Sequence, residues 1–161
     1  MNRPIKRIQT VSDTQKIIAC LYLPVHQQQL LLPNVSIAEV VDYQTPEEPI
    51  DRPDYFLGYV TWRGIRIPLL SYELANGQSS STVTTHVRIA VINSIGEHHE
   101  ALPFFAILTQ GIPRLVKVAS DLIKPLKSAV NKAETTSIKL DGEEAIIPNL
   151  SYLENLAFTN R

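Results

Sequence analysis

The feature that most constrains the fold is a succession of short runs of β-branched and other apolar residues, separated by clusters of Gly, Pro, Asn and Ser. Short runs bounded by such residues are typical of strands rather than helices. The runs predict strands at residues 16–25, 29–32, 40–44, 56–62, 65–70, 86–93, 102–108, 115–118, 137–140 and 144–147. The chain is therefore expected to be all-β.

Two pairs of these strands are predicted to form hairpins. Arg63-Gly64 separates 56–62 from 65–70, and Asp141-Gly142 separates 137–140 from 144–147. Glycine takes the positive φ that a two-residue turn requires, and Asp-Gly is a favoured turn pair. A helical turn is expected at 71–76 and a terminal helix at 149–156. Asn149 is the expected N-cap of that helix.

An internal repeat indicates two similar β-units. The string Ile-Pro-x-Leu-Ser-Tyr occurs at 67–72 and again at 147–152, each time after a hairpin that contains glycine, and a Ser/Thr-rich segment at 79–85 separates the halves. Units this small cannot each bury enough apolar surface alone. Two barrels packed along a common apolar seam would bury that surface and leave few open sheet edges.

Composition narrows the classes of function. The chain has 161 residues and a formal net charge of -1, with no large Lys/Arg cluster, which disfavours nucleic-acid binding. No apolar run approaches the ~18 residues of a membrane span, and the first ten residues do not resemble a signal peptide. Cys20 is the single cysteine, so no disulfide can form within the chain and a reducing compartment is expected. The sequence therefore favours a cytoplasmic protein without membrane insertion.

No set of residues typical of a catalytic, cofactor or metal site is found. The sequence lacks a Gly-rich nucleotide loop, a nucleophile elbow and an H-E-x-x-H helix. His98 and His99, between Glu97 and Glu100, come nearest to a metal site, but the segment is a predicted turn and suits a solvated polar tip. Cys20, within an apolar strand, is expected to be an inert buried thiol. An enzyme is not predicted.

Two segments carry an unusual combination of residues. Residues 35–41 form an apolar stretch interrupted by Glu39, and in residues 58–70 Arg63 ends an apolar strand immediately before a turn glycine. These segments resemble the CheW family of chemotaxis coupling proteins, whose pattern is matched by Glu39, Gly58, Arg63, Gly64 and Pro68. Gly111, the run 115–118 and the segment 121–125 resemble the second half of the family pattern, so the resemblance covers about residues 16–157.

The sequence departs from the family pattern at several positions. Ser71 replaces a frequent acid and Tyr72 a usual leucine, while Ala106 and Gln110 stand where a glycine and an acid are common. With these departures, the sequence resembles the divergent accessory adaptors of type IV pilus chemosensory systems, of the ChpC type. They leave open whether one of the partner interfaces has been lost.

The resemblance implies a CheW-like domain at 14–157, after a flexible N-terminus at 1–13. Its fold is expected to be two packed SH3-like five-stranded β-barrels with short helices, a first barrel at about 30–85 and a second at about 86–148, completed by the terminal segments. The implied function is that of a non-enzymatic scaffold that couples a chemoreceptor to a CheA-type histidine kinase. The implied partners are the regulatory domain of that kinase, the cytoplasmic tip of the receptor and other CheW-like proteins.

The resemblance also indicates the partner-binding residues. Glu39 and Arg63 are expected to form an ion pair at the edge of the groove between the barrels; the alternative is that the two charges end their strands independently. Trp62 and Ile67 are expected in the core. The predicted partner-binding set is Val35, Ile37, Glu39, Tyr43, Phe56, Gly58, Arg63 and Gly64.

The four apolar members of that set are Val35, Ile37, Tyr43 and Phe56, and they have an alternative role as core residues, since alternating apolar residues of strands are usually buried. A different function is also open: a small β-barrel module that binds a ligand or an oligonucleotide. Such a module would need an aromatic stacking platform and a basic groove.

Overall fold

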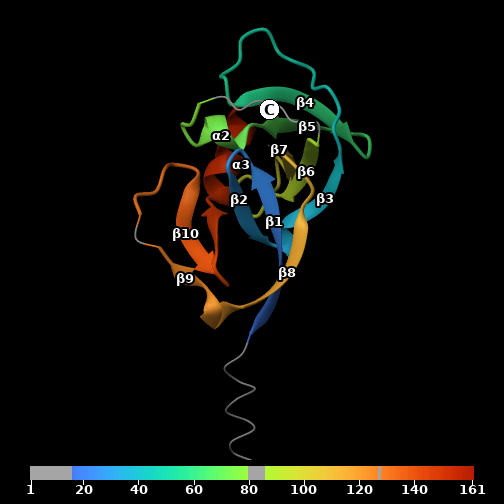
Figure 1. The fold of residues 1–161 in the computed structure, drawn as a ribbon. Coiled ribbons are helices and arrows are strands. Elements are labelled where there is room, and N and C mark those ends of the chain that lie inside the picture. Colours follow the sequence, from blue (N-terminus) through green and yellow to red (C-terminus); the bar gives the residue numbers. More distant parts are fainter. Residues whose placement is uncertain (1–15, 80–85, 127) are drawn as a thin grey trace, which may run out of the picture.

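The computed structural model describes residues 16–79, 86–126 and 128–161 (Figure 1). The expected flexible N-terminus, 1–13, and all of the 79–85 linker except Ser79 lie outside the described residues. The described part is built mainly of strands in two packed sheets, with a few short helices. The all-β prediction is therefore confirmed.

Each sheet mixes strands from distant parts of the chain. The six-stranded sheet has the order β8 (Arg114–Ala119), β1 (Ile17–Val25), β2 (Gln28–Pro33), β11 (Glu143–Pro148), β10 (Glu134–Leu140), β9 (Lys124–Pro125). The five-stranded sheet has the order β3 (Ile37–Asp42), β6 (Arg88–Asn93), β7 (Phe104–Thr109), β5 (Ile65–Leu70), β4 (Phe56–Trp62). Neighbours are antiparallel except in the β2–β11 and β5–β7 pairs, which are parallel. The short elements are η1 (Asn34–Ser36), α2 (Tyr72–Ala75), η2 (Ser120–Leu122) and α3 (Leu150–Thr159).

Two strands cross from one sheet to the other. β3 follows β2 along the chain but pairs with β6, and β8 follows β7 but pairs with β1. The boundary expected near residue 86 therefore does not separate the sheets, because strands from both sides of it lie in each one. The described strands also form two open sheets rather than two barrels closed by backbone pairing.

The sheets bury apolar residues on both of their faces. One cluster, which includes Leu23, Leu30 and Phe105, lies between the two sheets. A second lies on the other face of the five-stranded sheet and includes Trp62 and Ile67, whose predicted core positions are confirmed. A third covers the other face of the six-stranded sheet. Burial on both faces explains why several strands read as continuous apolar runs instead of alternating patterns.

The local predictions hold at the turns and caps. Arg63 and Gly64 have φ of 48° and 76°, and Asp141 and Gly142 have 50° and 80°, so both hairpins turn with positive φ at both central residues. The N-cap predicted at Asn149 is confirmed, since its Oδ1 accepts the Tyr152 N–H at 3.0 Å. Several strand boundaries differ from the prediction. β3 begins at Ile37 instead of residue 40, because Ile37 pairs with Ile92 and packs against the core between the sheets. β10 begins at Glu134 instead of residue 137, and the two-residue β9 was not predicted.

The two copies of the repeated string occupy equivalent places in the topology. Each copy contains the end of a hairpin strand, β5 or β11, that pairs in parallel with a strand of its sheet. The helices then begin at different points of the string. Ser71 Oγ accepts the Leu74 N–H at 3.2 Å and caps the four-residue α2, whereas Asn149 caps the ten-residue α3 two string positions earlier.

Gly58 is needed for a close backbone approach. Its φ is +128°, and a Cβ at this position would lie 2.3 Å from the Glu47 carbonyl oxygen. The register of β4 against β5 shifts between Phe56 and Gly58, and Glu47 pairs with Tyr59 through N–H to O contacts of 2.8 and 2.9 Å. Gly58 is buried, and its role in the fold is to let the segment before β4 pair with this strand.

We expect Gly58→Ala to lower the free energy of unfolding by about 2–4 kcal/mol, because it adds a backbone clash to a conformation that disfavours alanine. Urea unfolding followed by circular dichroism measures this loss. Gly77→Ala is the matched control, since φ is +79° there and a Cβ would meet nothing within 4 Å. The control should cost about 1 kcal/mol. Equal losses in the two variants would contradict the close-approach role.

Candidate partner-binding site

Side chains close the gap between the two edge strands of the five-stranded sheet, β3 and β4. Trp62 Nε1–H donates to Glu39 Oε1 at 2.9 Å. Beyond the end of β3, the Gln44 amide donates to the Thr61 carbonyl at 2.9 Å and accepts the Thr61 N–H at 3.0 Å. These bonds take the place of backbone pairing, so the sheet curls around the apolar cluster that contains Trp62. We call this side-chain junction the β3–β4 seam.

Glu39 and Arg63 form the predicted ion pair at this seam. Arg63 Nη2 lies 3.2 Å from Glu39 Oε1, and the guanidinium lies 4.9 Å from the centre of the Trp62 ring. Phe104 packs edge-on against the same ring, with ring centres 4.8 Å apart. Both charged side chains are solvent-accessible, so screening keeps their contribution to folding small. The pair instead fixes the direction of two charges beside an aromatic ring.

The seam keeps Glu39 ionised. The hydrogen bond from Trp62 holds the pKa of Glu39 below its ordinary value, and the Arg63 charge acts in the same direction against partial desolvation. Since the folded pKa is lowered, the stabilising effect of the carboxylate is present above its unfolded pKa. That effect is lost as the pH falls through the folded value.

The structure brings some of the predicted apolar residues to the surface and buries others. Val35 in η1 is 83% exposed, and Ile37 at the start of β3 is half-buried. Tyr43 lies beyond the other end of β3, where it lines a hollow of about 250 Å³ with Leu57. Phe56 is 2% exposed and packs in the core between the sheets. Its predicted place on a contact surface was therefore wrong, because the bulge at Gly58 turns this end of β4 inward.

Sequence reasoning missed an apolar surface where the six-stranded sheet extends past its partner. β1 and β8 run side by side down from the body of the molecule (Figure 1). Leu115 of β8 is 61% exposed and Ile17 of β1 is 65% exposed. Leu115 pairs with Leu21, which packs against the core between the sheets, so this face continues the core to the surface. η1, which carries Val35, lies against β1.

A second charged pair, also missed, occupies the corresponding place in the six-stranded sheet. Arg114 at the start of β8 lies 2.7 Å from Glu143 at the start of β11, and its guanidinium lies 4.6 Å from the centre of the Tyr22 ring. As at the β3–β4 seam, a crossing strand meets a hairpin through an ion pair beside an aromatic ring. The charges are reversed: here the crossing strand carries the arginine. Neither residue belongs to the sequence pattern from which the Glu39–Arg63 pair was predicted.

Of the four positions that depart from the CheW pattern, three are buried and one is half-buried. Ser71 is the N-cap of α2, and Tyr72 is fully buried with its hydroxyl donating to the Ala133 carbonyl at 3.3 Å. Ala106 is fully buried in β7. Gln110 is half-buried, and its backbone N–H donates to the Pro24 carbonyl at 2.8 Å. None of these four side chains lies on the exposed surface around Val35.

The histidines and the cysteine that were considered as catalytic residues or metal ligands contact different parts of the protein. His98 stacks on Phe158 at 3.8 Å between ring centres, while His99 Nδ1 contacts the Gly96 carbonyl. Burial raises the pKa of the Cys20 thiol. Within the described residues, no group of three or more His, Cys, Asp or Glu side chains is placed to hold a metal ion. The described helices are also all too short or too polar to cross a membrane.

Comparison with known proteins agrees with this architecture. The profile of the CheW-like domain family matches residues 19–156. Among solved structures, the crystal structure of the scaffolding protein TtCheW from Thermoanaerobacter tengcongensis superposes with a TM-score of 0.73 at 16% sequence identity, covering 86% of this chain and 92% of that chain. No curated protein gave a significant sequence match. At this identity the structural similarity concerns the fold.

Protonation of Glu39 should be visible in the fluorescence of Trp62, the single tryptophan. As the pH falls through the folded pKa of Glu39, below its ordinary value, the carboxylate becomes a weaker acceptor for the indole N–H and the emission should change. Glu39→Gln should remove this titration step, while Glu143→Gln, at the other charged pair, should retain it. An unchanged step in Glu39→Gln would contradict the assignment.

Proposed function

The chain belongs to the CheW-like domain family, and on that premise we propose that it is a non-enzymatic, cytoplasmic scaffold coupling a chemoreceptor to a CheA-type histidine kinase. Support comes from the family match, which spans nearly the whole described fold. It also comes from the exposed Glu39–Arg63 pair, which lies at the same junction as the hairpin tip Arg63-Gly64. The proposed partners are the regulatory domain of the kinase, the cytoplasmic tip of the receptor and other CheW-like proteins.

The observation that carries the receptor part of this proposal is the apolar surface formed by Val35, Ile17 and Leu115. Three large aliphatic side chains are more than half exposed on neighbouring elements, in continuity with the core between the sheets. A protein-binding surface needs an apolar centre and a polar rim. We propose that the helical tip of the receptor lies on this surface. Glu39 and Arg63, on the strand and hairpin next to it, would orient the tip.

We also propose that the chain is a divergent adaptor of the ChpC type, acting with a type IV pilus system. Ser71, Tyr72 and Ala106, which depart from the family pattern, are all buried. The interior of this chain has therefore diverged from the family pattern more than its surface. The proposed receptor surface, formed by Val35, Ile17 and Leu115, is therefore compatible with these departures. The pathway itself is tested by identifying which kinase binds.

Direct binding to the regulatory domains of the CheA-type kinases of the same organism tests the adaptor function. Calorimetry should give saturable binding with a dissociation constant in the micromolar range or tighter, about -8 kcal/mol. Arg63→Glu is included to test whether the hairpin tip contributes to this interface. Absence of binding to every kinase would reject the proposed coupling function and leave the fold assignment standing.

Reversing charges tests whether the seam pair acts as a unit. Glu39→Arg or Arg63→Glu alone should reduce capture of the receptor fragment, because each places like charges 3.2 Å apart in the present geometry. The double reversal should restore part of the lost capture, since the opposite pairing is regained, although an arginine at position 39 cannot accept the Trp62 indole N–H. A double variant no better than the single ones would show that the two charges act independently.

Substituting the exposed apolar residues tests the receptor surface. Val35→Ser and Leu115→Ser should each weaken capture of the receptor fragment roughly tenfold, by removing a buried contact of about 1–2 kcal/mol in the complex. Ile50→Ser is the control, because Ile50 is 99% exposed on the loop before β4. Equal effects at all three positions would reject the assigned surface.

A further inference from the structure

The β4–β5 hairpin carries a second charged surface, on the face opposite Trp62 and Glu39. Side chains alternate along a strand, so Tyr59 and Arg66 lie on the other side of the hairpin from Trp62 and Ile67. The end of α3 covers this side: Tyr59 Oη–H donates to the Asn160 carbonyl at 2.9 Å. The Asn160 amide in turn donates to Tyr55 Oη at 3.0 Å. The Glu39–Arg63 pair and this surface are therefore separate.

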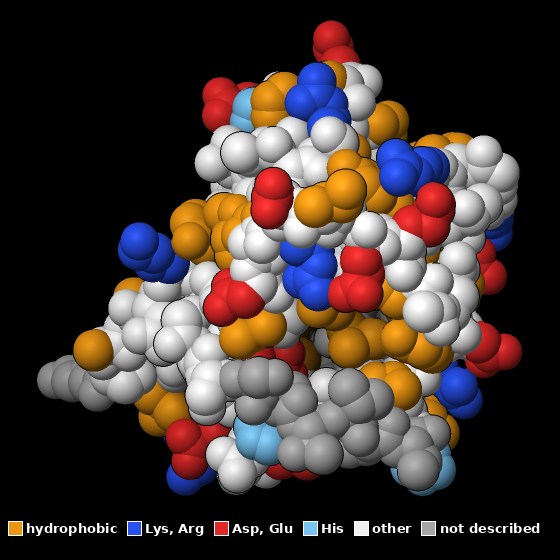
Figure 2. Space-filling model, turned by 90° about the horizontal axis from the view of Figure 1, so that it is seen from above, with side chains coloured by type: hydrophobic (Ala, Val, Ile, Leu, Met, Phe, Trp, Pro, Cys, Tyr) orange, Lys and Arg blue, Asp and Glu red, His pale blue; other side chains and the backbone are white. Residues whose placement is uncertain are grey.

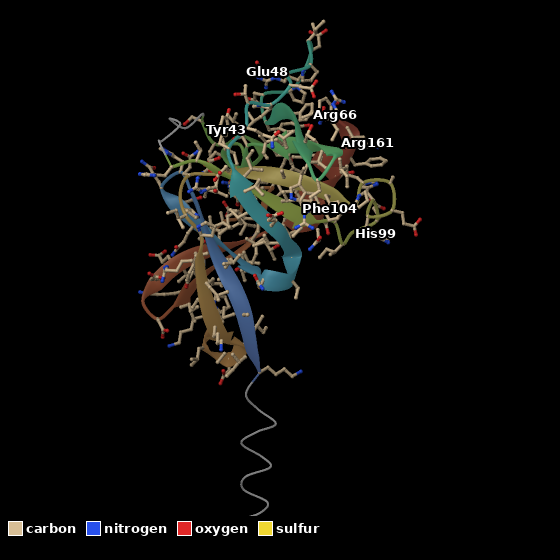
Figure 3. The ribbon with its side chains drawn as sticks, turned by 90° about the vertical axis from the view of Figure 1, so that its right-hand side faces the viewer. Tyr43, Glu48, Arg66, His99, Phe104 and Arg161 are labelled. Atoms are coloured by element: carbon tan, nitrogen blue, oxygen red, sulfur yellow. The ribbon has the colours of Figure 1, made fainter. Side chains whose placement is uncertain are left out.

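Two arginines are stacked on aromatic rings there. The Arg66 guanidinium lies 3.6 Å from the centre of the Tyr59 ring, and Tyr59 packs edge-on against the buried Phe56. The Arg161 guanidinium lies 3.8 Å from the centre of the Phe158 ring, whose other side is covered by His98. Both arginines are labelled on the same side of the molecule in Figure 3, and the hydrogen bond from Tyr59 Oη–H to the Asn160 carbonyl connects the ring below Arg66 to the residue before Arg161.

These stacks leave most guanidinium N–H groups directed to solvent. Within the described residues, Arg66 pairs with an acid through Nε, at 3.4 Å from Glu47 Oε1, and both side chains of that pair are more than half exposed. Arg161 donates through Nη1 to the Phe158 carbonyl at 3.0 Å. A guanidinium has five N–H donors in a planar fork that matches a carboxylate. A guanidinium already held against a ring loses less conformational freedom when it binds.

We propose that Arg66 and Arg161, supported by Tyr59 and Phe158, form a docking site for an acidic segment of a partner protein. Two fixed guanidiniums linked through Tyr59 and Asn160 suit two neighbouring carboxylates of such a segment. Among the described residues, Glu47 is the one acidic side chain that pairs with either arginine. The surrounding charge favours a short peptide over a nucleic acid. The chain has a net charge of -1, and the view onto the β4 side shows acidic and basic side chains interspersed with hydrophobic ones (Figure 2). This site does not depend on the proposed adaptor function.

NMR titration of the full chain with a hexaglutamate peptide tests the site. The arginine Nε–Hε signals of Arg66 and Arg161 should shift in a saturable manner. Arg66→Lys and Arg161→Lys, which keep the charge but lose the planar fork, should each weaken binding about fivefold. Arg88→Lys is the matched control, because Arg88 pairs with Asp42 at 3.2 Å and stacks on no aromatic ring of the described residues, and it should leave the affinity unchanged.

Three results would overturn the proposal. The first is the absence of saturable shifts at the two arginines. The second is an equal loss of affinity in Arg88→Lys, which would indicate general charge attraction. The third is tighter binding of hexathymidylate than of hexaglutamate at the same ionic strength, which would assign the surface to nucleic acid. Binding of the kinase regulatory domain is measured separately, so failure here and failure of the adaptor function remain distinguishable.

Discussion

The apolar layer between the two sheets is the contact on which the rest of the structure depends. Leu23 and Leu30 of one sheet and Phe105 and Ile107 of the other are completely buried in it. Strands from each half of the chain lie on both sides of this layer, because β3 and β8 each cross to the opposite sheet. Each sheet therefore contains strands from both halves of the chain, and the two halves bury their apolar faces together.

The same junction that curls the five-stranded sheet also presents the candidate binding residues. Glu39 accepts a hydrogen bond from the nearly buried Trp62 and an ion-pair contact from the exposed Arg63. One oxygen thus links the apolar interior of the sheet to a charge on the surface. The hairpin carrying Arg63 is held on its other face by α3 through Tyr59 and Asn160. Both faces of this hairpin are fixed, which suits a surface that must present side chains in a defined direction.

The candidate site could be predicted only in part. The Glu39–Arg63 pair was found because both residues match a family pattern, and the exposure of Val35 follows from its position in a turn. Phe56 was misplaced because its exposure depends on the bulge at Gly58, which only the approach of Glu47 explains. Leu115 has the sequence character of a core residue. It is exposed because β1 and β8 extend beyond the other sheet, and the residues next to it in the sequence do not indicate this.

By itself the sequence determined the approximate positions of the described strands other than β9, both hairpin turns and the cap at Asn149, since these conformations depend on a few adjacent residues. It did not determine which sheet each strand joins or that β3 begins at Ile37. It also did not indicate that side chains instead of backbone pairs close the β3–β4 seam. The tertiary structure decided these features because they depend on which distant apolar faces bury each other. That choice involves residues far apart in the chain, so the residues next to each strand in the sequence do not indicate it.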